Sequence, residues 1–463
     1  MDEWKIMFKV FGSTHKRDSM VRRSFVQAGA LGVGGLTLPD FLSLRPSVSD
    51  AQAAVRIDQA KTSVILIWMS GGPGHHETWD PKPNALDQFR GPFGAISTSV
   101  PGVQFSEMLP EQSEVAEHLA VLRTVCHRTG DHTKGNHWML TGFEGPDFNA
   151  SDNKIQRRPS VGSVTAALRG PVMKGMPAYV AAPHLRGGTD NFFHYAAYAG
   201  ARHNPFVVNS DPNSDRFRVD NLRLQPAMTL DRLEDRRQLL HAVDEIRRDA
   251  DRRMSNMSGY QRSAFELLTS RTVREAFDIS AEPEDIRDSY GRHTFGQSAL
   301  LARRLVERGV TFVTVNTQPW DHHGTANRLP TEKGAKQLIP PADIAITGLI
   351  RDLRARGMLE STMVVAMGEF GRTPKMNSAA GRDHWGHTFS VMMAGGKIVG
   401  GTVVGRSDER GAHVVDRPVH PEDVIATVYQ HLGIDARKTA IKDRTGRPLY
   451  LVERGEVIKE LFG

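Results

Sequence analysis

Residues 63–73 read Ser-Val-Ile-Leu-Ile-Trp-Met-Ser-Gly-Gly-Pro, and this stretch decides the fold class. Its first part, Ser63–Trp68, is a continuous apolar run between Lys61 and the paired glycines 71 and 72. A strand with one solvent face would alternate polar and apolar residues, whereas a continuous run suits a strand buried on both faces. The stretch therefore predicts a strand inside a parallel sheet.

Similar apolar runs recur along the chain, and helical segments separate several of them. The runs cover residues 119–125, 178–182, 311–315, 362–366 and, more weakly, 389–394. Apolar residues have helical spacing over 295–306 and 342–353. This alternation predicts an α/β fold, a doubly wound and mostly parallel sheet with helices on both faces. Ligands of such sheets bind at the carboxyl ends of the strands.

Composition narrows the class of protein. The 463 residues are enough for one large sheet with insertions. The 59 basic and 53 acidic residues are well mixed, and without a long basic tract nucleic acid is not an expected partner. The single cysteine, Cys126, excludes an intramolecular disulfide framework. Any metal site must therefore use histidine, aspartate and glutamate.

The N-terminal segment resembles a twin-arginine export signal. Arg22 and Arg23 precede a weakly apolar, glycine-rich stretch at 28–38, and residues 51–53 form an Ala-Gln-Ala cleavage site. The stretch is shorter than the roughly 20 apolar residues that span a bilayer. We expect residues 1–53 to be a leader and residues 54–463 to form the mature domain, periplasmic or extracellular, with no transmembrane segment. The alternative is a core or lipid-facing helix beside a chance arginine pair.

Residues 229–277 differ from the rest of the chain. Many charged residues surround apolar ones at steps of three, four and seven, which predicts an amphipathic helix or helix pair. Together with its neighbours this segment predicts a helical and loop insertion at about 184–290, which could cap an active site. A solvated insertion packed by one apolar stripe is favoured over a partner-binding coil.

Two glycine-containing loops follow the first predicted strands. The loop at 71–80 carries His75, a potential metal ligand or a hydrogen-bonding residue of the loop. The loop at 129–138 carries Thr133 before a short predicted helix. A hydroxyl at a helix N-terminus near a metal can be activated as a nucleophile, and Thr is also a good N-cap. Both roles stay open for Thr133.

Two later loops hold denser sets of metal-binding residue types. Asp321 and His323 are two apart, so on an extended segment they would point to the same side. Glu369 follows the run at 362–366, and His384 comes soon after it, in a group with Asp383 and His387. Carboxylates and imidazoles are the donors that a dication binds in proteins. We therefore predict a composite metal centre.

Two arginines flank these carboxylates. Arg372 and Arg382 could each bind an anionic substrate through two parallel hydrogen bonds. Alternatively, each could pair with Glu369 or Asp383. The structural pairing is the more conservative interpretation for both.

Several motifs together resemble the bacterial family DUF1501. The resemblance rests on the glycine-rich loop with His75, the Trp-Asp-His-His segment at 320–323, Gly-Glu-Phe-Gly-Arg-Thr-Pro at 368–374, Gly-Arg-Asp-His-Trp at 381–385, the twin-arginine leader and the tail at 416–435. The family has no characterised function and is grouped with the alkaline phosphatase and sulfatase superfamily. The resemblance implies an alkaline-phosphatase-like α/β fold and one or two metal ions.

The resemblance also implies roles for single residues. Asp321 with His323 looks like the Asp/His pair of one metal, and His384 looks like the late metal-binding histidine. Glu369 stands where the superfamily usually has the Asp of an Asp-His-Gly motif, and Thr133 falls at the position of the nucleophile. The chain departs from the pattern at His75, where an Asp is usual. It also departs at Phe370, where a His is usual, and at 126–130, which lacks the sulfatase signature Cys-x-Pro-Ser-Arg.

Two functions are consistent with these residues. The first is an exported hydrolase of phosphate or sulfate esters that depends on zinc, manganese or calcium, with one or two ions. Thr133 would attack, Arg372 would hold the anion, and the substrate could be a sulfated or phosphorylated glycan. The alternative is a non-catalytic metal- or glycan-binding surface protein that retains the fold, as the departures at His75 and Phe370 would allow.

Overall fold

A computed structural model describes residues 62–145, 156–183, 192–219, 222, 267–325 and 328–463. The expected leader at 1–53 and most of the expected amphipathic helix at 229–277 lie outside these residues. Within the described part of the chain, no helix is long and apolar enough to cross a membrane.

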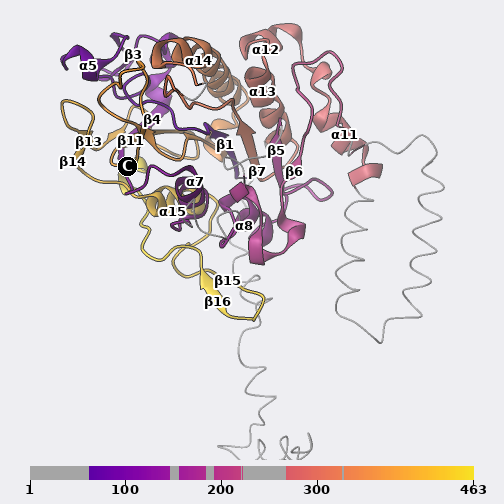
Figure 1. The fold of residues 1–463 in the computed structure, drawn as a ribbon. Helices are drawn as coiled ribbons and strands as arrows, with labels where there is room; N and C mark the ends of the chain where they lie inside the picture. The colour runs from indigo at the N-terminus through magenta and orange to yellow at the C-terminus, as the bar shows by residue number, and fades with distance from the viewer. Residues whose placement is uncertain (1–61, 146–155, 184–191, 220–221, 223–266, 326–327) are drawn as a thin grey trace, which may run out of the picture. The chain divides into compact units, whose positions relative to one another are not determined.

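An eight-stranded sheet forms the centre of the domain (Figure 1). Its strand order is β12-β4-β11-β8-β1-β7-β5-β6. The strands are β1 (Ser63–Trp68), β4 (Leu119–Val125), β5 (Tyr179–Ala182), β6 (Phe206–Val207), β7 (Phe312–Asn316), β8 (Thr362–Met367), β11 (Phe389–Ala394) and β12 (Val403–Val404). Strand β1 pairs in parallel with β7 on one side and β8 on the other. Only β11 among these eight runs antiparallel to its neighbours.

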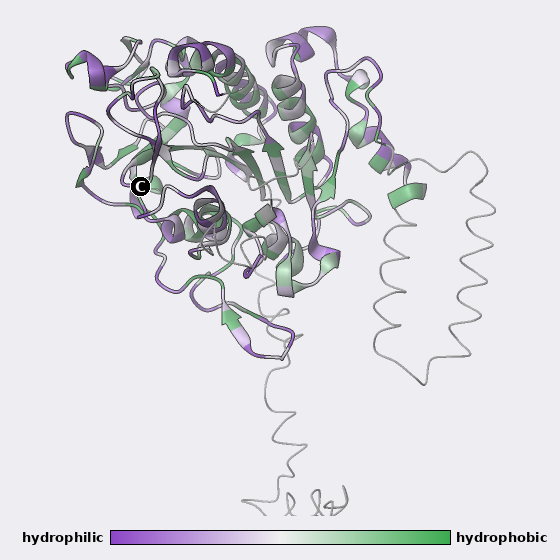
Figure 2. Ribbon diagram, in the orientation of Figure 1, coloured by the Kyte–Doolittle hydropathy of each residue, from purple (hydrophilic) through white to green (hydrophobic). Residues whose placement is uncertain are grey.

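Helices cover both faces of this sheet, and Figure 1 shows the two layers on its opposite sides. The helices are α7 (His132–Thr141), α8 (Val161–Leu168) and α15 (Pro421–His431) on one face, and α13 (Thr294–Glu307) and α14 (Thr331–Ala355) on the other. Successive side chains of β1 enter different cores: Ile65 packs with α13 and α14, whereas Leu66 packs with α8 and α15. Figure 2 shows the apolar strands between these layers. The predicted doubly wound α/β fold is confirmed.

Burial explains why Ser63–Trp68 forms the central strand. All six residues are at most 3% exposed, and the apolar ones lie within one of the two cores. Burying one such side chain completely stabilises the fold by about 1.5–3 kcal/mol. Strand β1 therefore anchors both helical layers.

Smaller elements surround the sheet. The described ones are α5 (Asp87–Arg90), β2 (Ala95–Ser97), β3 (Gln104–Ser106), α6 (Pro110–Glu114), η1 (Ala116–His118), η2 (Phe192–His194), η3 (Ala197–Ala199), η4 (Ala201–His203), α11 (Arg271–Phe277), η6 (Ile279–Ala281), α12 (Glu284–Ser289), η7 (Leu359–Ser361), β9 (Gly371–Arg372), β10 (His384–Trp385), β13 (Arg406–Ser407), β14 (Val414–Asp416), β15 (Ala440–Lys442), β16 (Pro448–Tyr450) and η8 (Lys459–Leu461). The two-stranded sheet of β9 and β10 matters most for function because it carries two of the predicted site residues.

The structure differs from the sequence expectations in three details. The expected insertion contributes β6, which extends the main sheet beyond β5. Strand β12 forms the opposite edge and was not predicted. Helix α14 begins at Thr331, well before the predicted residue 342, and runs through Pro340 and Pro341.

Candidate metal centre

The candidate site lies where several strands of the main sheet end. Asp321 follows β7, Glu369 follows β8, and His132 opens helix α7 after β4. His384 begins β10 and pairs with Arg372 of β9. Elements that are distant in sequence therefore deliver their polar side chains to the carboxyl edge of the parallel sheet, which is where α/β proteins bind ligands.

Asp321 is the centre of this group. Its Oδ1 lies 2.6 Å from Nε2 of His323 and 3.1 Å from Nε2 of His384. Its Oδ2 lies 3.7 Å from Nε2 of His132. One ligand atom each from His132, Asp321 and His384 lie within 4.8 Å of one another, which is close enough to hold a single metal ion.

The three histidines share one hydrogen-bonding pattern. Nδ1 of His132 lies 2.6 Å from Oε1 of Glu369, Nδ1 of His323 lies 3.1 Å from Oδ1 of Asp383, and Nδ1 of His384 lies 2.7 Å from the carbonyl oxygen of Gly130. Each of these oxygens accepts, so each imidazole donates from Nδ1. Metal-binding histidines are held in the same way, with the other ring nitrogen turned to the metal.

This pattern fits a bound cation. With Nδ1–H donated, a neutral imidazole directs the lone pair of Nε2 toward the Asp321 carboxylate. Several electron-rich atoms that face one another repel unless a positive charge lies between them. Imidazole nitrogens with a carboxylate are typical zinc ligands, whereas calcium prefers an all-oxygen shell.

Burial and neighbouring charges shift the pKa values of Asp321 and His384. Burial by itself would raise the pKa of Asp321, but the neighbouring imidazoles of His132 and His384 and the charge of Arg372 hold that pKa well below its usual range. Burial lowers the pKa of His384, and the neighbouring His132 acts in the same sense, while Asp321 opposes it. Asp321 is therefore a carboxylate at neutral pH.

Glu369 holds His132 in place through a hydrogen bond. Its side chain is fully buried, and its oxygens accept the N–H of Gly71 at 2.8 and 3.0 Å as well as Nδ1–H of His132. Gly71 has a φ of +98°, and a Cβ there would lie 2.8 Å from the backbone nitrogen of Trp320. Only glycine therefore allows this close approach between the loop after β1 and the loop before Asp321.

Replacing Glu369 with glutamine is expected to lower metal affinity by roughly 10- to 100-fold, the usual cost of losing a group that orients a metal-bound histidine. The amide has the same shape, but its NH₂ group would face either His132 or the N–H of Gly71, and both are donors. Titration of the metal-free protein with zinc, followed by calorimetry, measures the change. An affinity within twofold of the unchanged protein would contradict the orienting role.

Arg372 is buried against the same loops. Its guanidinium donates to Oδ1 of Asp321 at 2.8 Å and to the carbonyl oxygens of Gly72 at 2.9 Å, Trp320 at 3.0 Å and Arg382 at 3.1 Å. The residue is 2% exposed. In this arrangement Arg372 positions Asp321 and holds the loops together. It therefore has a structural role, as one of the two alternatives proposed, but it pairs with Asp321 and not with Glu369 or Asp383.

Arg382 is also buried and pairs with Glu77 at 2.8 Å, not with Glu369 or Asp383. The arginine that approaches Asp321 from the solvent side is Arg328. Its Nε lies 3.3 Å from Oδ2 of Asp321, and its side chain is 45% exposed. Arg328 was not predicted from the sequence, because it stands in a segment without a recognisable motif.

The structure places His75 apart from the centre. Its Nε2 lies 2.8 Å from the carbonyl oxygen of Gly411, and its ring tilts against His76 at 4.3 Å. Burial lowers the pKa of His75 to about 4. Between the residues that the structure describes, no hydrogen bond or ion pair joins His75 to Asp321.

Thr133 follows His132 in the first turn of α7. It is 2% exposed, and its hydroxyl has no hydrogen-bond partner among the described residues. The expectation that Thr133 caps the helix is corrected: Asp131 is the N-cap, and its carboxylate accepts the N–H of Lys134 at 2.9 Å. The helix begins at His132, so Thr133 is already helical.

Two further residues complete the site: His132, which was not predicted from the sequence, and Asp383, which was named there only as a member of the group around His384. His132 contributes Nε2 to the centre, and Asp383 holds the ring of His323. One signal for His132 was present: it lies in the loop after β4, the same position relative to a strand as the other site residues. The sequence predicted a helix that begins after Thr133, whereas helix α7 already begins at His132.

The fold and the site define a doubly wound α/β protein with a histidine- and aspartate-rich candidate metal centre at the carboxyl edge of its sheet. Residues 61–462 match the family described as "Protein of unknown function (DUF1501)", and the chain belongs to this family. The resemblance seen in the motifs is thereby confirmed. Among curated proteins, none matches the sequence.

Several solved structures are similar to the chain at low identity. The sulfatase PsFucS1 from Pseudoalteromonas sp. is 13% identical, with a TM-score of 0.36 over 83% of this chain and 72% of that one. Alkaline phosphatase from the Antarctic bacterium TAB5 is 11% identical, with a TM-score of 0.36 over 81% of this chain and 99% of that one. The lipoteichoic acid synthase LtaP from Listeria monocytogenes is 10% identical, with a TM-score of 0.38 over 85% and 75%. The strand order above, and not these weak similarities, carries the fold assignment.

Proposed function

We propose that the protein is an exported metal-dependent hydrolase of phosphate or sulfate esters. The observation that supports this most is the convergence of three imidazoles on Asp321, each with Nδ1 held by an oxygen. The proposed ligands are His132, Asp321 and His384, with His323 beside them. His75, which is hydrogen-bonded to Gly411, is not in the proposed set.

The donor set favours zinc most, because imidazole nitrogens suit it, and calcium least, because calcium prefers an all-oxygen shell. One ion is expected. Phe370 packs its ring 4.4 Å from that of His384 and 5.0 Å from that of His132, where the superfamily pattern has a further histidine. An apolar ring there offers no ligand for a second ion.

The residues around the centre have separate roles in this proposal. A divalent ion at these ligands would supply Lewis-acid stabilisation of negative charge on the ester group. Glu369 holds His132, Arg372 holds Asp321, and the exposed Arg328 contacts the anionic group of the substrate. The Thr133 hydroxyl is the proposed attacking group, since it has no partner and lies at the first turn of α7, where free N–H groups favour an anion.

Elemental analysis and an ester panel test the proposal together. The purified mature chain should contain about one zinc or manganese per molecule, the number that one set of ligands binds. It should then hydrolyse at least one phosphate monoester, phosphate diester or sulfate ester, and lose turnover on chelation. Metal binding without turnover of any ester would instead favour the non-catalytic binding protein. Absence of bound metal would count against the hydrolase.

The role of Thr133 is tested by replacing it with alanine and, separately, with serine. If the hydroxyl attacks, alanine should reduce kcat by at least about 100-fold, the scale of losing a chemical group that acts in the transition state. Serine keeps the hydroxyl and should restore most of the rate. Unchanged turnover in the alanine variant, with the metal content intact, would remove Thr133 from the mechanism.

A further inference from the structure

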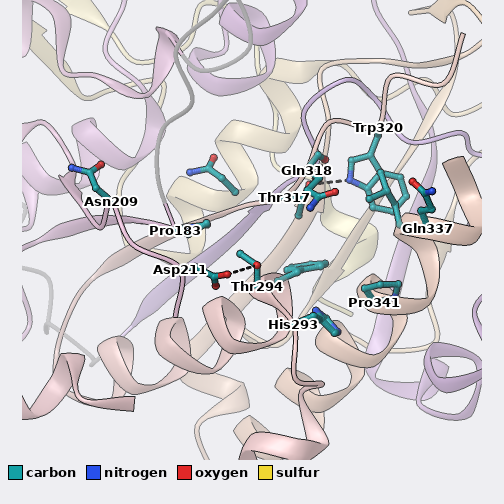
Figure 3. Close-up of a pocket in the computed structure, with 13 residues that line it drawn as sticks. Pro183, Asn209, Asp211, His293, Thr294, Thr317, Gln318, Trp320, Gln337 and Pro341 are labelled. Carbon is teal, nitrogen blue, oxygen red and sulfur yellow. Dashed lines mark hydrogen bonds between the residues drawn. The ribbon is translucent and has the colours of Figure 1, made fainter. Parts of the chain in front are cut away.

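A second feature of the domain is a cavity of about 430 Å³ beside the metal centre. It lies past the ends of β5, β6 and β7 and is bounded by the start of α13 and the first half of α14. Figure 3 shows Asn209 and Asp211 on one side of it and Trp320 and Gln337 on the other. Its volume is within the range of small-ligand pockets, about 300–1,000 Å³.

Side-chain amides are prominent in the lining. Asn209, Gln318 and Gln337 come from three different elements, are exposed, and make no side-chain hydrogen bond to other described residues. Each amide offers donors on its nitrogen and an acceptor on its oxygen. Such groups match hydroxyls, which also donate and accept.

The charge of the described lining favours an uncharged ligand: its titratable side chains are His293 and Asp211. No lysine or arginine is among the described residues that line the cavity. The one carboxylate, Asp211, accepts the hydroxyl of Thr294 at 2.8 Å and thus lies at the N-terminus of α13. Its negative charge offsets the positive end of that helix. An uncharged ligand fits this lining better than a sulfate or phosphate.

The cavity also has an apolar wall. Phe295, Trp320 and Pro341 contribute it, and the indole N–H of Trp320 is already donated to Oγ1 of Thr317 at 2.9 Å. The indole is therefore fixed. Aromatic and proline surfaces together with amides suit a sugar ring, which has apolar C–H faces and hydroxyls at its rim.

One loop joins this cavity to the metal centre. Trp320 lines the cavity, and the next residue, Asp321, is a candidate ligand of the metal centre. Arg372 donates to the carbonyl oxygen of Trp320 and to the carboxylate of Asp321, which fixes the two residues relative to each other. A single substrate could therefore place its anionic ester group at the metal centre and an uncharged part in the cavity.

We propose that this cavity binds an uncharged sugar unit of the ester substrate whose anionic group lies at the candidate metal centre. The inference rests on the proposed function and names the substrate class more closely: a glycan ester with a neutral sugar next to the charged one. The sugar subsite is recognised by amides, while the metal centre recognises the charge.

Direct binding of neutral sugars tests the cavity without any hydrolysis. Methyl glycosides of galactose, glucose, mannose and N-acetylglucosamine are titrated into the mature chain and followed by saturation-transfer NMR and calorimetry. At least one should bind. Gln318→Ala and Gln337→Ala should each weaken that binding by roughly two- to twelvefold, the worth of one neutral hydrogen bond. Gln430→Ala, an exposed glutamine on α15, is the matched control and should not change it.

The outcomes separate this inference from the proposed hydrolase. Ester hydrolysis without binding of any neutral sugar would overturn the subsite and leave the hydrolase standing. Sugar binding that the two cavity variants do not change would also overturn it. Sugar binding that both variants weaken supports the subsite, whether or not ester turnover is found.

Discussion

Replacing His384 with alanine should empty the candidate centre of its metal. His384 directs Nε2 toward Asp321 and is held by the carbonyl oxygen of Gly130, so the variant removes a ligand without adding a new group. Losing a residue that merely orients a ligand costs about 10- to 100-fold in affinity. Losing the ligand itself should lower metal affinity by at least about 100-fold. Zinc or manganese content after dialysis, measured by mass spectrometry, and the rate of ester hydrolysis should fall together.

His387→Ala is the matched control for this experiment. It removes an imidazole three residues away in the same segment, where the side chain is exposed and its ring lies against Trp385. Metal content should stay at the level of the unchanged protein, and circular dichroism should show that both variants are folded. Equal metal content in the two variants would exclude His384 as a ligand.

Much of the fold could be predicted because buried strands have an unambiguous signature. Ser63–Trp68 and Leu119–Val125 were predicted with the bounds that the structure gives, since both are dominated by apolar residues and largely buried on both faces. Phe389–Ala394 was found by the same signal, but strand direction leaves no trace in side-chain pattern, so its antiparallel pairing was not predicted. Strands of two residues, such as β12, are too short to show a period.

Helix α14 begins earlier than the helical segment that was predicted from apolar spacing at 342–353. Pro340 and Pro341, which directly precede that segment, lack backbone N–H groups and normally end or kink a helix. In the structure the helix runs through both prolines, and residues on either side of them, such as Ala335 and Ile346, are buried in the same core. Packing against the sheet thus outweighs the local preference.

The sequence predicted where the candidate site lies better than it predicted which residues hydrogen-bond to one another there. Asp321 and His384 stood out because acidic and imidazole side chains follow predicted strands. The role of His132 depends on its hydrogen bond to Glu369, a residue 237 positions away. Contacts between residues so far apart in the sequence depend on the order of the strands in the sheet. A single sequence does not reveal that order. The same holds for Arg372, whose partner is Asp321.

The second large effect is expected far from the centre, at Arg303 of α13. This guanidinium is fully buried and lies 2.6 Å from Glu282, 2.7 Å from Glu307 and 2.8 Å from Asp352 of α14. Arg303→Met keeps most of the side-chain volume but leaves buried carboxylates with less compensating charge. Removing one partner of a buried ion pair typically costs about 3–5 kcal/mol. Urea unfolding at neutral pH should show a loss of that size.

An exposed ion pair on the neighbouring helix provides the contrast. Lys336 pairs with Glu332 at 2.6 Å on α14, but both side chains are more than half exposed. Lys336→Met should change the free energy of unfolding by about 0.5 kcal/mol or less, because solvent screens such pairs. Since α13 and α14 also bound the sugar cavity, the Arg303 variant should lose sugar binding only as it unfolds. A cost below about 1 kcal/mol for Arg303→Met would mean that Arg304 and Arg356, which also reach Glu282, compensate for its charge.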